Sequence, residues 1–247
     1  SDITISSWQW DMGGTGTYQF GSSTSQNPVF LYDSCGTYNV QLIIVDDNGC
    51  NDTIIQPVDV YCEPIALFEA DTVCQGDTTQ FTNLSNQGPN PSAAIIAYSW
   101  NMGSTGTFVN GTSSASANPS FVYNSCGIHN VELTATDANG CTHTITIPIQ
   151  VYCNPTANFS APAICFDDQP LQFNDTSIDG DGTVNTWIWN FGDPNNGTAA
   201  GQNPLYTFAD CGIYNVQLSV TDDNTCTDDI TIPVEIYCEP TAAFNYT

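Results

Sequence analysis

Residues 126–153 read CGIHNVELTATDANGCTHTITIPIQVYC, and this stretch decides the fold. Apolar and polar residues alternate through residues 131–135 and again through residues 145–151. A period of two is typical of strands that bury one face. Between the two runs, Asn139-Gly140 suits a tight reversal of the chain with positive φ. The stretch therefore predicts an antiparallel β-hairpin.

The hairpin stretch is one copy of an internal repeat that the cysteines mark. Successive cysteines are separated by 15, 12 and 12 residues, once from Cys35 and again from Cys126, and a third series begins at Cys211. Each copy also contains an aromatic segment with Trp, an Asn-Pro pair and a closing Tyr-Cys-x-Pro. Such a repeat indicates one structural unit used several times. We expect a partial unit at residues 1–62, whole units at 63–153 and 154–238, and the first strand of a following unit at 239–247.

The charge of the chain excludes several classes of partner. The sequence has no Lys or Arg and 26 acidic residues, a formal net charge of −26. Nucleic-acid binding needs cations that displace counterions from phosphate, so it is excluded. Anionic membrane surfaces repel this chain for the same reason, and no stretch approaches the roughly 20 apolar residues of a membrane span. The chain shows no targeting signal and opens with a strand-like segment. We therefore interpret it as part of a longer protein.

Three recurring segments resemble the PKD (polycystic kidney disease) domain family. They are the aromatic-x-Trp-Asp/Asn-Met/Phe-Gly segment, seen at residues 98–103, the Asn-Pro-x-aromatic segment, and Gly-x-Tyr-x-Val-x-Leu-x-x-x-Asp. The resemblance covers nearly the whole chain. It implies an all-β fold of tandem Ig-like (PKD-type) antiparallel β-sandwiches, as in stalks, adhesins and accessory modules of secreted proteins of Bacteroidetes-type bacteria. The family's Gly-Asp-Gly is altered in the first two units, and only Gly192-Asp193-Pro194 retains the Asp.

The sequence offers no catalytic constellation. His129 occupies the place of Tyr38 and Tyr214 on the inward face of a strand, so we expect a structural histidine. His143 stands where the other units have Asp, and we expect it on the exposed surface. No nucleophile, metalloprotease or phosphate-loop motif is present. We therefore expect no enzyme activity and no required cofactor.

The tryptophans allow two interpretations. Trp100 and Trp189 lie in the recurring aromatic segment, where residues two apart share one face of a strand. Such a row could stack against sugars, or it could fill the seam between the two sheets of a sandwich. We expect the second, with Trp100 and Trp189 buried.

The cysteine spacing fits disulfides rather than zinc ligands or a redox pair, and disulfides indicate an oxidising compartment. In an Ig-like sandwich the last two strands form a hairpin, and Cys126 and Cys153 lie opposite each other at its open end. Side-chain parity there requires a bulge near Gly127. Cys74 lies at the same end, about 30 Å from the hairpin turn of its own domain but close to the turn of the next domain. We predict the pairs Cys126–Cys153, Cys35–Cys62 and Cys211–Cys238, and an inter-domain pair Cys74–Cys226.

Acidic residues gather at the same predicted junction. Asp179, Asp181 and Asp223 lie in loops of the third unit, and carboxylate oxygens without a neighbouring cation suit Ca²⁺. The alternative is ordinary turn-forming Asp and solvated charge. The sequence therefore predicts a calcium site formed by these three residues, with the alternative left open.

The function that the repeats favour is structural. Repeats that contact only their neighbours build quasi-one-dimensional objects, and an inter-domain disulfide would stiffen such an object. We expect a secreted, cell-surface rod, filament or adhesin stalk whose partners are neighbouring copies or repeats. The alternative is a glycan- or protein-binding accessory module of a secreted adhesin or hydrolase, with surface glycans as partners.

Overall fold

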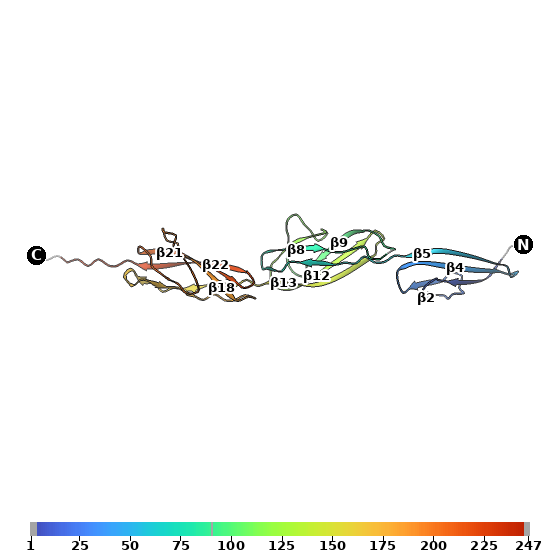
Figure 1. Cartoon of the computed structure of the whole chain (residues 1–247), viewed down its shortest axis with the longest axis horizontal. Helices are drawn as coiled ribbons and strands as arrows, with labels where there is room; N and C mark the ends of the chain where they lie inside the picture. The colour runs from blue at the N-terminus through green and yellow to red at the C-terminus, as the bar shows by residue number, and fades with distance from the viewer. Residues whose placement is uncertain (1–3, 90, 245–247) are drawn as a thin grey trace.

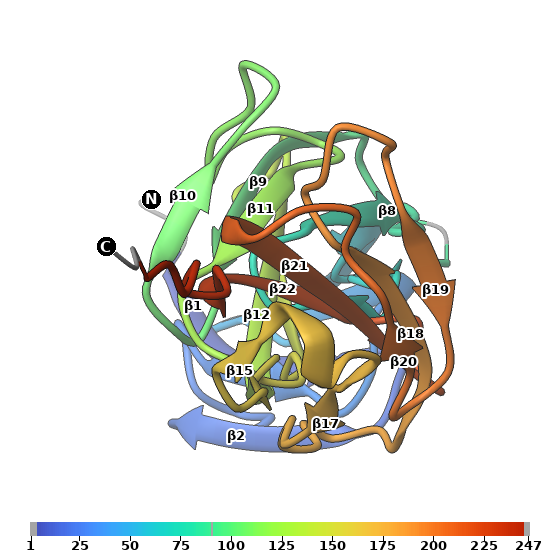
Figure 2. The same ribbon diagram turned by 90° about the vertical axis from the view of Figure 1, so that its left-hand side faces the viewer.

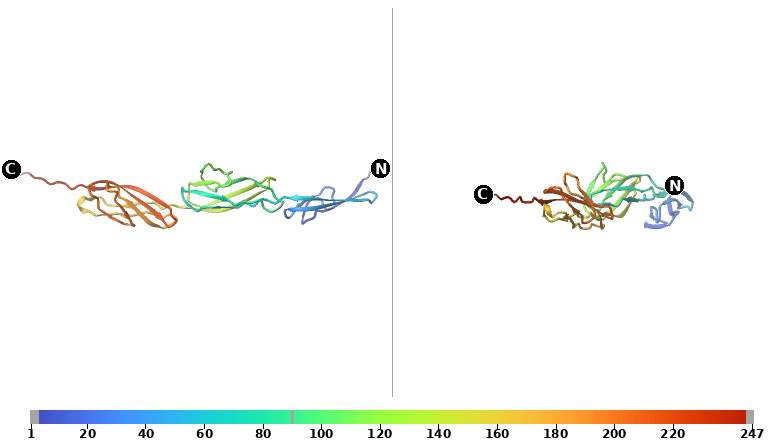
Figure 3. Two further views of the ribbon diagram at one scale, coloured as in Figure 1. Left: turned by 45° about the horizontal axis from the view of Figure 1, so that its top comes forward. Right: turned by 60° about the vertical axis from the view of Figure 1, so that its left-hand side comes forward.

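The structure, a computed structural model, describes residues 4–89 and 91–244, which form three bodies arranged end to end (Figure 1). Figure 3 shows the same elongated arrangement from other sides. Figure 2 looks along the long axis from the C-terminal end, so the three bodies lie behind one another. We call them the first, second and third domain.

The first domain contains two small sheets. One has the strand order β1-β4-β5 and the other pairs β2 with β3. The hairpin of β4 and β5 forms the long spine of the domain, with Val45 opposite Asn51 next to the turn. The strands are β1 (Ile5–Asp11), β2 (Gly16–Phe20), β3 (Val29–Tyr32), β4 (Gly36–Asp46) and β5 (Asn51–Val60).

The second domain is a two-layered sandwich. Its sheets have the orders β7-β13-β12-β9 and β10-β11-β8-β6, and all pairs are antiparallel except β7 with β13. The strands are β6 (Phe68–Ala70), β7 (Val73–Cys74), β8 (Thr78–Asn83), β9 (Ile95–Asn101), β10 (Gly106–Phe108), β11 (Ser120–Tyr123), β12 (Gly127–Asp137) and β13 (Thr142–Tyr152).

The third domain repeats this plan, with a larger sheet of order β15-β22-β21-β18-β19 facing two short strand pairs, β14 with β17 and β16 with β20. One 3₁₀ turn, η1 (Phe166–Asp168), precedes β16. The strands are β14 (Phe159–Ser160), β15 (Ile164–Cys165), β16 (Leu171–Gln172), β17 (Asn174–Asp175), β18 (Val184–Asn190), β19 (Thr198–Ala200), β20 (Leu205–Tyr206), β21 (Gly212–Asp222) and β22 (Thr227–Tyr237). The chain is thus a tandem array of Ig-like β-sandwiches, as the sequence indicated.

The hairpin that decides the fold forms in the expected register. Gly127 lies opposite Val151, and the ladder of β12 and β13 continues to Thr136 and Thr142 without a shift. Between the last ladder pair, Gly127–Val151, and the disulfide Cys126–Cys153, the second strand has one extra residue, so the irregularity expected near Gly127 lies just beyond the regular ladder. Gly127 there takes a φ of +109°, which glycine tolerates.

A tryptophan stands at the centre of each complete sandwich. Trp100 is 4% exposed and Trp189 is 0% exposed, so both are core residues rather than a platform for sugars. The ring of Phe68 lies edge-on to Trp100 at 4.9 Å, and Phe159 meets Trp189 in the same way at 5.1 Å. Such aromatic pairs add stability beyond the area they bury. The opening strand of each complete domain thus covers the tryptophan of the same domain.

The indole N–H of each core tryptophan is also satisfied. Trp100 Nε1 donates to the carbonyl of Ser116 at 2.9 Å, and Trp189 Nε1 donates to that of Gly201 at 2.9 Å. A buried donor without a partner would cost free energy, so the loop after each tryptophan strand is tied to the core by this bond.

Asp193, the aspartate that only the third domain retains, forms a buried hydrogen-bond cluster. The Gly197 N–H donates to its Oδ1, and the Tyr206 hydroxyl donates to Oδ2 at 2.8 Å. The bond from Gly197, followed by that from Tyr206, lowers the pKa of Asp193 below its ordinary value. Burial and the neighbouring Asp193 raise the pKa of Tyr206 to about 12. Asp193 therefore anchors the loop that follows β18.

Trp189→Ala should destabilise the third domain by about 3–5 kcal/mol, because it empties the centre of the core. Ile188→Ala is the matched control, since Ile188 is 56% exposed on the opposite face, and it should change stability by no more than about 0.5 kcal/mol. Denaturant unfolding measures both. If the Trp189 variant kept its stability, the tryptophan would not be the centre of the core.

The third domain should lose stability in acid through Asp193. A carboxyl whose pKa is lower in the folded state stabilises the fold above its unfolded value of about 3.9, and this contribution is lost as the pH falls through the lower folded pKa. Asp193→Asn should remove that part of the pH dependence below about pH 4. Melting temperatures of both proteins across pH 2–6 provide the measurement, and parallel curves would contradict the assignment.

Candidate functional site at the inter-domain junction

Four disulfides connect the described residues. Three of them, one in each domain, close the open end of the long hairpin, and the fourth joins the second domain to the third. The pairs are Cys35–Cys62, Cys126–Cys153, Cys211–Cys238 and Cys74–Cys226. These are the pairs expected from the spacing, and the inter-domain bond makes the junction the most distinctive site of the chain.

Both cysteines of the inter-domain bond are held by secondary structure. Cys74 ends the short strand β7, which pairs in parallel with β13 so that Cys74 lies beside Tyr152. Cys226 immediately precedes β22, and its side chain is 1% exposed. The two Cα atoms are 5.5 Å apart, within the range of ordinary disulfides. A pole of one sandwich is therefore fixed to the facing pole of the next.

A buried aspartate shapes the turn that presents Cys226. Asp222 is 2% exposed, and its Oδ1 accepts the N–H groups of Asn224 at 3.0 Å and Cys226 at 2.8 Å. Thr225 between them has a φ of +69°, a strained conformation for a β-branched residue. The equivalent position in the second domain is Gly140, at +84°. The carboxylate and the disulfide together hold this turn in shape.

The same carboxylate cap recurs in the other two hairpin turns. Asp137 Oδ1 accepts from Asn139 and Cys141, and Asp46 Oδ1 accepts in the same way from the turn of the first domain. Sequence reasoning missed this role. The available signal was an Asp four residues before the second cysteine of each series, which is the Asx-turn pattern.

The linker between the second and third domains is clasped by the loop that precedes β18. The Cys153 N–H donates to Asp181 Oδ2 at 2.9 Å, and the Asp181 N–H donates back to the Cys153 carbonyl at 3.2 Å. Asn154 Nδ2 adds a bond to the Gln75 carbonyl at 3.2 Å. A Cβ atom on Gly180 would lie 2.2 Å from the Cys153 carbonyl oxygen, so only glycine allows this close approach. The linker therefore has little freedom to swing.

The three acidic residues of the predicted calcium site each accept a hydrogen bond from a backbone N–H group instead. Asp179 Oδ1 accepts the Val184 N–H and Asp223 Oδ1 accepts the Thr183 N–H, each at 2.8 Å, while Asp181 holds the linker. Among residues 4–89 and 91–244, no group of three or more His, Cys, Asp or Glu side chains is placed to hold a metal ion. The structure thus does not gather Asp179, Asp181 and Asp223 into a metal site, because their oxygens are directed to separate N–H groups of the loop.

The linker between the first and second domains is held by a backbone hydrogen bond, and no disulfide among the described residues spans it. The Cys62 N–H donates to the Pro91 carbonyl at 2.8 Å, and Gly88 packs against the carbonyl of Glu63. Cys141 occupies the place of Cys226 in the hairpin turn of the second domain, but its thiol is free and half-buried. Cys50 and Cys165 are also free, and both are exposed. Within the described residues, only one of the two junctions is therefore closed by a disulfide.

Neither histidine has a catalytic setting. His129 is 6% exposed, stacks on Tyr123 at 4.3 Å and shares a hydrogen bond with the Ser125 carbonyl through Nε2. Tyr214 makes the equivalent bond to the carbonyl of Asp210, so His129 is structural, as expected. The expectation for His143 was wrong. It is half-buried rather than exposed, because its Nδ1 accepts the Ala66 N–H at 3.0 Å and so fixes the opening segment of the second domain.

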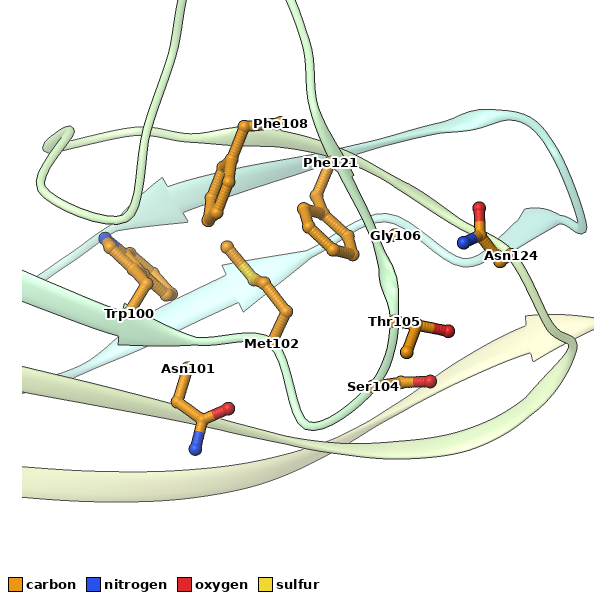
Figure 4. Close-up of a pocket in the computed structure, with 9 residues that line it drawn as sticks. All are labelled: Trp100, Asn101, Met102, Ser104, Thr105, Gly106, Phe108, Phe121 and Asn124. Atoms are coloured by element: carbon orange, nitrogen blue, oxygen red, sulfur yellow. The ribbon is translucent and has the colours of Figure 1, made fainter.

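An open hollow of about 470 Å³ lies beside the core of the second domain (Figure 4). Figure 4 shows Met102, Phe108 and Phe121 on one side of it and Ser104 and Thr105 on the other. The first domain has a similar hollow at the equivalent place. The described residues that line the two hollows include no His or Cys, and the hollow of the second domain has no carboxylate either.

The repeats match one family along their whole length. A family model described as the PKD domain matches residues 1–60, 61–151 and 152–237. The chain belongs to the PKD domain family. Each matched segment ends within two residues of the second cysteine of a hairpin-closing disulfide, so the covalent ends of the domains coincide with the ends of the PKD repeats.

Known relatives carry this PKD domain in larger proteins. The pre-pro-metalloprotease PrtV of Vibrio cholerae serotype O1 (strain M66-2) is 29% identical over 151 residues, which are 61% of this chain and 15% of that protein. The crystal structure of the PKD1 domain of Vibrio cholerae PrtV is 28% identical with a TM-score of 0.31 and covers 34% of this chain and 96% of that one. The PKD1 domain of Vibrio anguillarum Epp is 27% identical with a TM-score of 0.32 and covers 35% and 96%. This chain thus matches a small part of the curated relative.

No helix in the described part of this PKD array is long and apolar enough to cross a membrane.

Cleavage of the linker should leave the second and third domains joined. A protease site introduced between Asn154 and Pro155 cuts the backbone, but Cys74–Cys226 spans the cut, so denatured fragments should separate only after reduction. Cutting between Glu63 and Pro64 is the matched control. No disulfide among the described residues spans that position, and those fragments should separate without reductant. Non-reducing gel electrophoresis distinguishes the two results, and separation of both cut proteins without reductant would show that the inter-domain bond does not form.

Proposed function

We propose that this PKD array is a structural segment of an extracellular rod, filament or adhesin stalk. The observation that carries the proposal is the junction of the second and third domains. There the disulfide Cys74–Cys226 and two hydrogen bonds of the linker fix the two domains at three places. Repeats that touch only their neighbours extend in one dimension, and the bodies of this chain lie end to end (Figure 1). A junction that resists bending turns such a row into a rod.

The environment of the rod follows from its chemistry. Disulfides persist in oxidising compartments, and four of them in a chain of 247 residues favour the outside of the cell. The net charge of −26 keeps neighbouring molecules apart in solution and favours extension over collapse. Neighbouring repeats are the partners that this function requires.

A second candidate function is supported by the hollows. A glycan- or protein-binding module needs a concave surface that is partly apolar, and the hollow beside Met102 and Phe108 recurs in the first domain beside Met12 and Tyr18. Such a module would act as an accessory part of a secreted adhesin or hydrolase. Binding of this kind does not require a stiff junction, so stiffness separates the two candidates.

The angle between the second and third domains should vary less than the angle between the first and second. Negative-stain images of single molecules give both distributions. The double variant Cys74→Ser with Cys226→Ser should broaden the distribution of the angle between the second and third domains until it resembles that between the first and second. The reason is that, among the described residues, only the junction of the second and third domains has an inter-domain disulfide. Cys141→Ser is the matched control and should change neither distribution, since Cys141 is unpaired. Two equally broad distributions in the native chain would refute the rod.

A further inference from the structure

The opening segment of the second domain runs beside β13 along the whole length of that strand. The Ala66 N–H donates to His143 near the start of β13, and Cys74 pairs with Tyr152 at the end of β13. The pairing of β7 with β13 is parallel. The segment therefore crosses the second domain once, from the pole that carries the hairpin turn to the pole that carries Cys74.

The last strand of the third domain continues in the same direction. Cys226 immediately precedes β22, which pairs with β21 from Thr227 to Ile236. Cys238 follows β22 and bonds to Cys211 at the far pole. The second and third domains lie in line (Figure 1). The disulfide Cys74–Cys226 thus connects the end of a segment that crosses the second domain to the start of a strand that crosses the third.

This connection bypasses most of the two domains. Cys74 and Cys226 are 152 residues apart in the sequence, so their bond closes residues 75–225 into a loop. We call residues 63–74, the disulfide and residues 226–238 the covalent path. Tension along the covalent path reaches the closed loop only through non-covalent contacts. The hairpin-closing disulfides bypass far less, because each joins cysteines 27 residues apart.

The covalent path has little slack. It contains about 25 residues, so its fully extended length is at most about 80–90 Å. The strands β13 and β22 have 11 residues each, and at about 3.3 Å per residue each occupies about 36 Å of the folded domains. Tension can therefore lengthen the two domains by only about a fifth before the covalent path is fully extended.

The disulfide of the covalent path is also shielded from reduction. Cys226 is 1% exposed and Cys74 is 9% exposed. Thiol–disulfide exchange requires that a thiolate reach one of the two sulfur atoms. Asp222 and Asp223 lie in the turn that presents Cys226, and their charges repel an approaching anion. The bond is therefore protected while the two domains are folded.

We propose that the second and third domains form an inextensible tether, in which tension passes through the covalent path. The path reaches its full length before the two sandwiches are pulled apart, so the strands within residues 75–225 stay folded under tension. The inference rests on the same disulfide as the rod but goes beyond the rod, because it concerns stretching of the array rather than bending.

Single-molecule stretching of the intact chain, held by peptide tags at its two ends, tests the proposal. The double variant Cys74→Ser with Cys226→Ser transfers the tension to residues 63–126 and 153–211. About 100 more residues then carry the load, so the fully stretched variant should be longer than the native chain by about 330–360 Å. The first domain contributes the same length to both proteins, since neither substitution lies in it.

The double variant Cys126→Ser with Cys153→Ser is the matched control. It also removes one disulfide of the second domain. Both of these cysteines lie within the closed loop of residues 75–225, outside the covalent path. The fully stretched length of this variant should therefore equal that of the native chain.

A cut in the backbone gives a second test. A chain cut between Asn154 and Pro155 should still hold the load and reach the native stretched length, because this position lies within the closed loop. A chain cut between Glu63 and Pro64 should separate at low force, since that position lies on the covalent path and no disulfide among the described residues spans it.

Three results would overturn the tether. They are equal stretched lengths of the native chain and the Cys74→Ser, Cys226→Ser variant, separation of the chain cut at Asn154 at low force, and lengthening of the native second and third domains well beyond a fifth. A broad angle distribution between these domains would refute the rod but would leave the stretched lengths unchanged. The two proposals therefore fail separately.

Discussion

The structure depends on one constraint of composition, which is that the chain has carboxylates but no Lys or Arg to pair with them. Buried or crowded carboxylates must then find other hydrogen-bond donors, and the backbone N–H groups of loops are the ones available. Asp46, Asp137 and Asp222 each cap a hairpin turn, and Asp181 holds the linker between domains. The acidic residues thus order the loops at the poles of the domains.

The same constraint acts at the junction of the second and third domains, which a disulfide closes. Two acidic poles repel each other when they approach within a Debye length, and no cationic side chain is present to offset that repulsion. The disulfide Cys74–Cys226 and the short clasped linker maintain contact that electrostatics opposes. Hydrogen bonds hold the linker at both junctions, whereas among the described residues a disulfide closes only the junction of the second and third domains.

The core depends on aromatic packing, whereas the poles depend on hydrogen bonds to carboxylates. Trp100 and Trp189 are central because the opening strand of each domain supplies a phenylalanine that packs against the indole ring. In the first domain, Trp10 borders a groove and the apolar residues around it are accessible. The hairpin of β4 and β5 forms in this domain as in the other two, because the register of β4 on β5 needs only those two strands.

The sequence by itself determined the fold class, the repeat, the alternation within the hairpin and the burial of Trp100 and Trp189, because these depend on local periodicity and on patterns that recur in each unit. The disulfide pairs also followed from sequence, since the hairpin places Cys126 and Cys153 together. Only the tertiary structure decided what the acidic residues do. The sequence places the residues of the predicted calcium site close to one another or to a turn, namely Asp179, Asp181 and Asp223. The direction of each carboxylate depends instead on which backbone N–H groups the folded loops present. His143 is partly buried for the same reason, because its partner, Ala66, lies 77 residues away and reaches it only in the folded domain.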